Sequence, residues 1–154
     1  MIREMANEGN PTEPPADEEA LLAEPTRAVY VDDDPVWRSM IASMLEGQFD
    51  SLEVFGTPEE ALQRLQQEDR PNILWTDGDM SGMSGLQLAQ EVKRLDSTIT
   101  TVLISGGIRG LNINDEVART AHGIDFYLPK NNINRIEVQR LATTIKAARA
   151  QTTP

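Results

Sequence analysis

Apolar residues along the chain follow two alternating patterns. Short runs of apolar and β-branched residues are typical of buried strands, and apolar residues spaced three or four apart are typical of one helix face. The short runs predict five strands, at residues 28–31, 52–55, 73–76, 101–104 and 124–128. The periodic segments predict five helices, which begin at Pro35 and Pro58, contain Leu86 to Leu95, and span residues 115–121 and 134–150.

Local signals support the starts of two of these helices. Asp34 precedes Pro35, a pair that is typical of a helix cap followed by the first helical residue. Thr57 and Glu60 have the spacing of a capping box, in which each side chain bonds the backbone N–H of the other residue.

The alternation of strands and helices predicts an α/β domain with a doubly wound parallel sheet. Right-handed crossovers place helices on both faces of such a sheet. Its ligands bind beyond the carboxyl ends of the strands. The side chains that follow the predicted strands are therefore the candidates for a functional site.

Charged and polar side chains follow four of the five predicted strands: Asp32 and Asp33, Asp77 and Asp79, Ser105, and Lys130. Carboxylates that crowd together repel, and burying them unpaired is costly. A hard divalent cation such as Mg²⁺ relieves this repulsion, and it binds carboxylates together with carbonyls, waters and phosphate oxygens. A lysine and a hydroxyl beside that cation suit a phosphoryl group, because they offset its charge and donate hydrogen bonds to it.

Composition narrows the function classes. The formal net charge of −11 over 154 residues argues against a nucleic-acid-binding surface, which needs clustered lysine and arginine. The chain contains no cysteine, which excludes disulfides, thiolate catalysis and thiolate metal sites. It has no apolar stretch long enough to cross a bilayer and no secretion signal at its start, so we expect a cytoplasmic protein without membrane contact.

The acidic residues are concentrated at the start of the chain. Residues 1–25 carry seven acidic residues and one basic residue, with almost no aromatic or β-branched side chains. Such a segment buries too little apolar surface to offset its ordering entropy, so we predict a disordered acidic tail or linker. Residues 26–150 are predicted to form one domain and residues 151–154 a disordered end. Only QTTP follows residue 150, so we expect no output domain in this chain.

Four motifs at the predicted strand ends point to a known family: VDDDP at 31–35, WTDGDMSGMSG at 75–85, LISG at 103–106 and FYLPK at 126–130. In this order they make residues 26–150 resemble the receiver domains of response regulators in two-component signalling. The resemblance implies a flavodoxin-like, CheY-like fold, with five parallel strands in the order 2-1-3-4-5.

The resemblance also implies the chemistry of the acids. Asp77 is the phosphoacceptor, which takes a phosphoryl group from a histidine kinase or a histidine phosphotransfer protein. Mg²⁺ is held by Asp32, Asp33, Asp77 and Asp79. Of these, Asp33 is the direct ligand of the acid pair, Asp32 acts partly through water, and Asp79 contributes its backbone carbonyl.

The remaining site residues are implied to bind and report the phosphoryl group. Ser105 and Lys130 contact its oxygens, and Ser105 and Tyr127 form a conformational switch. A receiver catalyses only its own phosphorylation and a slow autodephosphorylation, so we do not expect an enzyme with an external substrate. The downstream protein target is left open, as is the choice between a stand-alone regulator and a receiver that belongs to a larger protein.

Several positions depart from the common pattern of that family. Ser81 stands where many receivers have proline, and Ser84 where many have an acid, which predicts a less constrained loop. Asn131 follows Lys130 where proline is usual, and a cis peptide bond there would be costly without proline. The glycine-rich stretch at residues 106–114 predicts a mobile, poorly formed fourth helix.

Two other protein classes also use aspartates two residues apart. Residues 77–82 fit the first positions of a calcium-binding EF-hand loop, but its twelfth position is Leu88 instead of glutamate, and a strand precedes it. Phosphatases of the haloacid dehalogenase type use the first aspartate as nucleophile and the second as acid or base, here Asp77 and Asp79. That class leaves the acids after the first strand unexplained, and it is kept as the alternative function.

Overall fold

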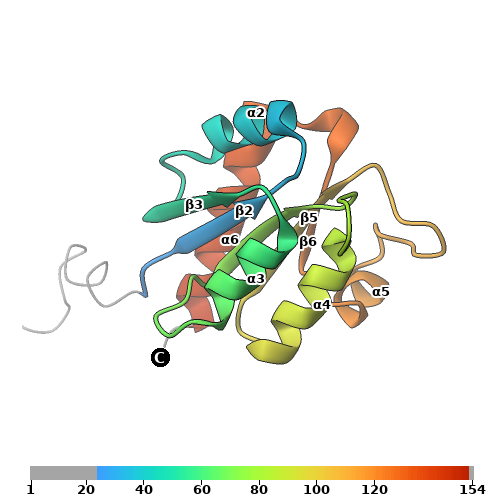
Figure 1. Cartoon of the computed structure of the whole chain (residues 1–154). Helices are drawn as coiled ribbons and strands as arrows, with labels where there is room; N and C mark the ends of the chain where they lie inside the picture. The colour runs from blue at the N-terminus through green and yellow to red at the C-terminus, as the bar shows by residue number, and fades with distance from the viewer. Residues whose placement is uncertain (1–23, 153–154) are drawn as a thin grey trace, which may run out of the picture.

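The computed structural model describes residues 24–152, which form five parallel strands in one sheet (Figure 1). The strands are β2 (Arg27–Val31), β3 (Ser51–Phe55), β4 (Ile73–Asp77), β5 (Thr100–Ser105) and β6 (Phe126–Pro129). Their spatial order is β3-β2-β4-β5-β6, which is the predicted order 2-1-3-4-5 counted along the chain. All five residues of β4 are buried, as its continuous apolar run predicts for a central strand covered on both faces. The prediction of a doubly wound parallel fold is confirmed.

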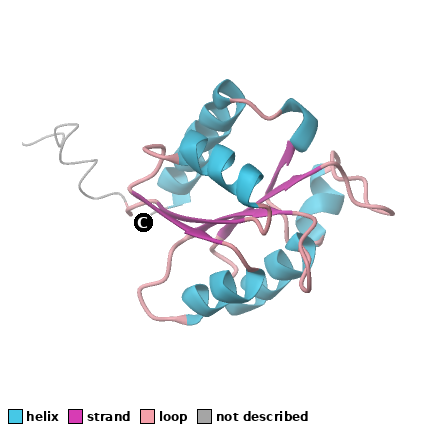
Figure 2. Ribbon diagram, turned by 45° about the horizontal axis from the view of Figure 1, so that its top comes forward, coloured by secondary structure: helices cyan, strands magenta, loops and turns pink. Residues whose placement is uncertain are grey.

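Helices cover both faces of the sheet, as Figure 2 shows. They are α2 (Pro35–Leu45), α3 (Pro58–Gln66), α4 (Gly85–Leu95), α5 (Glu116–Ala121), the 3₁₀ turn η1 (Lys130–Asn132) and α6 (Arg135–Thr152). One face packs against α2 and α6 through Ile41, Leu45, Val138, Ala142 and Ile145. The other face packs against α3 and α4 through Ala61, Leu65, Leu88 and Val92. Two apolar layers therefore bury both faces of the sheet, and the polar site residues lie at its carboxyl edge.

The helix starts follow the predicted signals with one difference. Asp34 caps α2, where its side chain accepts hydrogen bonds from the backbone N–H groups of Val36 and Trp37. Thr57 caps α3, but Glu60 Oε1 accepts a hydrogen bond from the Thr57 hydroxyl rather than from its backbone N–H. The predicted capping box is thus half formed.

The ends of the domain differ from the predicted boundaries. Glu24 and Pro25 lie against the domain, because the side-chain amide of Asn72 donates to Glu24 Oε1 at 3.0 Å and to the Pro25 carbonyl at 2.8 Å. At the other end α6 continues to Thr152, so residues 151 and 152 are helical and the predicted helix end at residue 150 is two residues short. The predictions for residues 1–23 and 153–154 lie outside the described residues.

The fifth strand also begins later than predicted. Ile124 is buried, but β6 starts at Phe126, although the Asp125 backbone N–H already donates to the Thr101 carbonyl of β5 at 3.0 Å. Asp125 Oδ2 accepts from the Thr101 backbone N–H at 2.9 Å and from Lys93 Nζ at 2.6 Å. The prediction therefore assigned Ile124 to the strand because it is apolar, although Ile124 lies before the start of β6.

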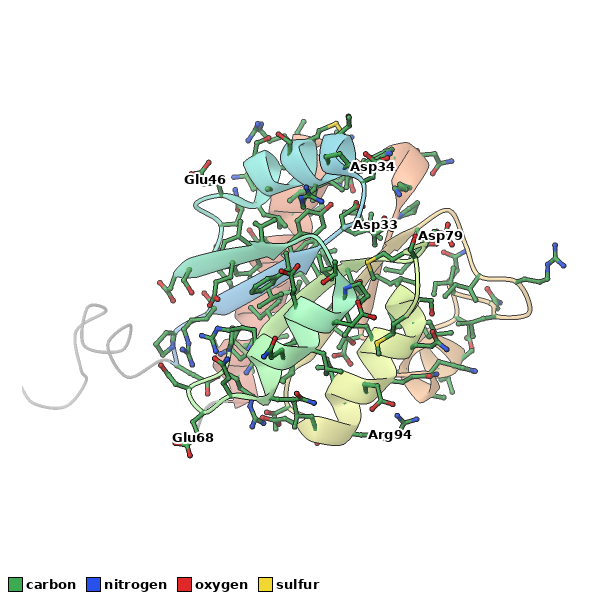
Figure 3. All side chains as sticks on the ribbon, in the orientation of Figure 1. Asp33, Asp34, Glu46, Glu68, Asp79 and Arg94 are labelled. Carbon is green, nitrogen blue, oxygen red and sulfur yellow. The ribbon has the colours of Figure 1, made fainter. Side chains whose placement is uncertain are left out.

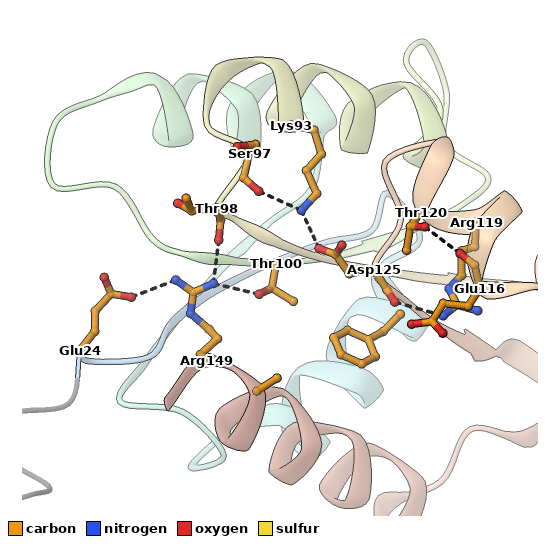
Figure 4. Close-up of a pocket in the computed structure, with 12 residues that line it drawn as sticks. Glu24, Lys93, Ser97, Thr98, Thr100, Glu116, Arg119, Thr120, Asp125 and Arg149 are labelled. Atoms are coloured by element: carbon orange, nitrogen blue, oxygen red, sulfur yellow. Dashed lines mark hydrogen bonds and ion pairs between the residues drawn. The ribbon is translucent and has the colours of Figure 1, made fainter. Parts of the chain in front are cut away.

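A polar hollow of about 580 Å³ lies at the amino ends of the strands, opposite the candidate site (Figure 4). Arg149, on the last turns of α6, spans it. One of its terminal nitrogens donates to the Thr98 carbonyl at 2.8 Å and to Thr100 Oγ1 at 2.9 Å, and the other pairs with Glu24 at 2.9 Å. These contacts connect α6 with the start of β5 and with Glu24, which precedes β2. The polar residues of the hollow therefore have a structural role.

We expect Arg149→Met to lower the free energy of unfolding by about 2 kcal/mol, because hydrogen bonds made by a charged donor are worth roughly 1.5–3 kcal/mol. Arg149 is only 14% exposed, so water replaces those bonds poorly. Urea unfolding measures the loss. The matched control is Arg140→Met on the same helix: Arg140 is 70% exposed, its one ion pair within residues 24–152 is with Glu137, and its change should stay within about 0.5 kcal/mol. Equal effects of the two substitutions would contradict the prediction.

Candidate functional site

The register of the two central strands brings the acids together. β2 and β4 are neighbours, with Tyr30 paired to Trp75 and Val31 paired to Thr76. Asp32 and Asp77 follow one position further along each strand. Carboxylate oxygens of Asp32, Asp33 and Asp77 lie within 4.8 Å of one another. The structure thus places these three predicted site residues in one cluster.

Burial differs within this acid cluster. Asp32 is fully buried and Asp77 is 2% exposed, whereas Asp33 is more accessible. Asp33 and Asp79 both lie at the carboxyl edge of the sheet (Figure 3). The Asp79 side chain is exposed and is not part of the cluster. Its predicted contribution through a backbone carbonyl therefore stays a prediction.

Lys130 reaches the cluster from the end of β6. Its Nζ donates to Asp77 Oδ1 at 2.7 Å and lies 4.6 Å from the centre of the Trp37 ring. Burial raises the pKa of Asp77, the Lys130 ammonium lowers it, and the negative charges of Asp32 and Asp79 raise it again, with a net pKa above the ordinary value. The Asp77 carboxylate is therefore held close to a cation in a site that disfavours negative charge.

The backbone after Lys130 is regular. The described residues contain no cis peptide bond, so the Lys130–Asn131 bond is trans, and Lys130 begins the 3₁₀ turn η1. The lysine reaches Asp77 without the proline that usually follows it in receivers.

Tyr127 is in contact with Ser105, and Ser105 is in contact with the loop that follows Asp77. The Ser105 hydroxyl accepts from the Gly107 N–H and donates to the Gly107 carbonyl, both at 3.1 Å. The Tyr127 hydroxyl donates to the Ser105 carbonyl at 2.8 Å. A Cβ atom on Gly78 would lie 2.8 Å from both Cβ and Oγ of Ser105, so the backbone after Asp77 packs directly on the serine. The two predicted switch residues are therefore mechanically connected to the acid cluster.

The loop between β4 and α4 has a tie that the sequence did not reveal. The Ser81 backbone N–H donates to Asp33 Oδ2 at 2.9 Å. Proline at this position has no N–H and could not make this bond. Serine at position 81 thus links the loop to the acid cluster, where a less constrained loop was predicted.

Two further residues contact the acid cluster and a third contacts Lys130, and none of the three was predicted as a site residue. The Tyr30 hydroxyl donates to Asp32 Oδ2, Arg38 donates to the Asp32 backbone carbonyl at 2.9 Å, and Trp37 lies against Lys130. Tyr30 could have been found from its position, because residues two apart on a strand point to the same face. Trp37 and Arg38 depend on how α2 packs on the sheet, which local sequence does not specify.

The acid cluster has the chemistry of a magnesium site. Mg²⁺ prefers oxygen ligands and is commonly held by one or two carboxylates together with waters and phosphate oxygens. Three carboxylates converge here, two of them buried, and the ion pair from Lys130 reaches one oxygen of Asp77. The residues present therefore fit a hard divalent cation.

The fold and this site together define a receiver-type α/β domain. The sequence model of the response regulator receiver domain family matches residues 28–144, and the chain belongs to this family. The family is a signalling module of two-component systems. No curated protein matches the chain significantly.

Solved structures agree with the fold. A CheY-like receiver domain protein from Methanospirillum hungatei is 20% identical, with a TM-score of 0.69, covering 83% of this chain and 98% of its own. The chemotaxis response regulator CheY4 of Vibrio cholerae is 18% identical, with a TM-score of 0.65, covering 79% and 99%. The receiver domain of a sensor histidine kinase from Pseudomonas aeruginosa is 16% identical, with a TM-score of 0.64, covering 80% and 99%, and holds a magnesium ion in its active site cleft. At these identities the likeness shows the fold alone.

One structural finding concerns membranes. Within residues 24–152 none of the helices combines the length and the apolar content that a membrane span requires.

Proposed function

We propose that this receiver domain accepts a phosphoryl group on Asp77 from a phosphohistidine of a histidine kinase or of a histidine phosphotransfer protein. One observation carries the proposal: Asp77 is buried at the end of β4, clusters with Asp32 and Asp33, and bonds Lys130 at 2.7 Å. In the transfer, an Asp77 oxygen forms a bond to phosphorus while the bond from phosphorus to the imidazole nitrogen breaks. The imidazole leaves with the electron pair of that bond.

Each neighbour of Asp77 has a separate task in this proposal. Lys130 holds Oδ1, so Oδ2 is the oxygen that attacks. The same ammonium then offsets charge on the phosphoryl oxygens, which is the main form of catalysis in phosphoryl transfer. Asp32 and Asp33, with Asp77 and the Asp79 backbone carbonyl, would hold Mg²⁺. The bound ion supplies further neutralisation of the phosphoryl charge.

The phosphorylated state is proposed to act through Ser105. To donate a hydrogen bond to the new phosphoryl group, the Ser105 hydroxyl must leave the Gly107 carbonyl. Tyr127, which bonds the Ser105 carbonyl, responds to the same movement. Phosphorylation thereby shifts an equilibrium between two arrangements of the segment after β5, and a downstream protein reads the difference.

The experiment that tests the function is incubation with Mg²⁺ and acetyl phosphate, followed by intact-mass spectrometry. We expect one phosphoryl group per chain, and none when EDTA removes the metal. Asp79→Asn should be phosphorylated to the same final extent, because the proposal requires only the backbone carbonyl of Asp79. Sustained hydrolysis of p-nitrophenyl phosphate by the wild type, lost in Asp79→Asn, would instead establish the phosphatase.

Mg²⁺ is expected to raise the melting temperature, because it binds the folded acid cluster and not the unfolded chain. At a hundredfold excess over its dissociation constant a ligand stabilises by about 2.7 kcal/mol. Asp33→Asn should reduce this gain while raising stability without metal, since one repelling charge is removed and the amide oxygen still accepts from Ser81. Thermal unfolding with and without MgCl₂ measures both effects. A wild-type melting curve that does not move in millimolar MgCl₂ would rule out the metal site.

A further inference from the structure

The two central strands carry the same short pattern, an aromatic residue followed two positions later by an aspartate. On β2 the pair is Tyr30 and Asp32, and on β4 it is Trp75 and Asp77. Tyr30 and Trp75 are register partners and are both fully buried. Each aromatic ring therefore lies on the same face of its strand as the aspartate that follows.

Only one of these aromatic residues bonds its aspartate. The Tyr30 hydroxyl donates to Asp32 Oδ2 at 2.9 Å. Trp75 Nε1 is buried and has no hydrogen-bond partner within the part of the chain that the structure describes.

The second oxygen of Asp32 is also bonded. The Asp34 backbone N–H donates to Asp32 Oδ1 at 2.9 Å. The terminal torsion of an aspartate is broad, so its own rotamer does not fix the plane of the carboxylate. One hydrogen bond leaves the carboxylate free to rotate about that contact, whereas two donors on different oxygens fix the plane. The Tyr30 hydroxyl is the second of these two donors, and it reaches Asp32 from the buried core.

We propose that Tyr30 is a positioning residue of the magnesium site, which orients the buried Asp32 carboxylate so that its remaining lone pairs face the acid cluster. The inference rests on the proposed function, because it assumes that the cluster binds Mg²⁺. Tyr30 itself does not touch the metal or the phosphoryl group. It acts through Asp32, in the way that hydrogen-bonded partners of metal ligands fix the ligands' orientation.

The test is the affinity of the full chain for Mg²⁺ alone, measured by isothermal titration calorimetry without a phosphodonor. Tyr30→Phe keeps the buried ring and removes only the hydroxyl. We expect a dissociation constant about tenfold higher, at the lower end of the range for losing a ligand's partner. Thr101→Val is the matched control, since it removes a buried hydroxyl that donates to the Gly123 carbonyl at the far end of the sheet. It should lower the melting temperature and leave Mg²⁺ affinity unchanged.

A double-mutant cycle separates positioning from general weakening of the fold. If Tyr30 acts through Asp32, Tyr30→Phe should not change Mg²⁺ affinity further in an Asp32→Asn background. Equal or tighter binding by Tyr30→Phe alone, or the same tenfold loss in both backgrounds, overturns the inference. The proposed function survives both of those results. Absence of Mg²⁺ binding by the wild type overturns the proposed function and the inference together.

Discussion

Asp77→Asn is expected to abolish phosphorylation by acetyl phosphate, as measured by intact-mass spectrometry in the presence of Mg²⁺. A neutral amide oxygen is a far weaker nucleophile than a carboxylate, and an asparagine cannot form the acyl phosphate. No other acid of the cluster is placed to compensate in the proposed arrangement, because Asp77 is the one bonded to Lys130. Labelling that persists in this variant would move the acceptor to another residue and remove the basis of the proposed function.

The variant must remain folded for this result to be informative, and the electrostatics predict that it does. The pKa of Asp77 in the folded protein lies above its ordinary value, chiefly because of burial. An acid with a raised folded-state pKa destabilises the folded protein at every pH at which it is ionised. Asparagine removes that penalty and keeps an oxygen that accepts from Lys130. Without metal at neutral pH, Asp77→Asn should therefore melt at or above the wild-type temperature.

The raised pKa of Asp77 also determines how the stability difference between Asp77→Asn and the wild type changes with pH. The stability advantage of Asp77→Asn is complete above the folded-state pKa of Asp77. This advantage shrinks as the pH falls through that value. It vanishes below the ordinary pKa of an aspartate, where Asp77 is protonated in both the folded and the unfolded wild type and is as neutral as the asparagine of the variant. Melting curves of the two proteins over a pH series in EDTA measure this convergence. An advantage that grows on acidification would contradict the raised pKa.

The sequence predicts the fold well because the same signals recur in most of its elements. Strands β2, β4 and β5 contain apolar runs, and helices α2, α3 and α4 show an apolar face with three- to four-residue spacing. Parallel strands also have their carboxyl ends at a common edge, so the positions of Asp32, Asp77, Ser105 and Lys130 followed once the strands were assigned. The parallel arrangement of the strands therefore brings residues that are far apart in the sequence to the same edge of the sheet.

Some contacts that the sequence did not reveal are local, and others join residues that lie far apart along the chain. Ser84 and Gln87 form the complete capping box at the start of α4, while the box predicted at Thr57 is half formed. Both pairs have suitable residues, but Gln87 accepts from the backbone N–H of Ser84, whereas Glu60 accepts from the hydroxyl of Thr57. Glu24 was assigned to a solvated segment, because its partner Arg149 lies 125 residues away along the chain. Local sequence cannot indicate such a partner.

Gly85, the first residue of α4, is where the fold and the site depend on each other most closely. A Cβ atom there would lie 2.1 Å from the carbonyl oxygen of Asp77 and 2.9 Å from Gly78 Cα. The Gly85 N–H also donates to the Gly78 carbonyl at 3.1 Å. Helix α4 thus starts directly against the backbone that carries the proposed phosphoacceptor, and both neighbours are backbone atoms that cannot turn aside as a side chain does.

Gly85→Ala is therefore expected to destabilise the protein by about 3 kcal/mol, at the upper end of the usual overpacking cost. Helix propensity acts in the opposite direction, because alanine is favoured over glycine within a helix by about 1 kcal/mol. The sign of the measured change in the free energy of urea unfolding thus decides which effect dominates. Gly106→Ala is the matched control, because among the described residues no heavy atom beyond its two chain neighbours lies within 4 Å of its added Cβ, and its change should stay within about 0.5 kcal/mol.

The clash also predicts a chemical effect beyond lost stability. Relief of the contact must move either α4 or the Asp77 backbone, and the second movement separates Asp77 from Lys130 and Asp32. At a temperature where Gly85→Ala is still fully folded, its rate of labelling by acetyl phosphate should therefore fall well below that of Gly106→Ala. A stabilised Gly85→Ala with unchanged labelling would mean that α4 does not rest on the Asp77 backbone.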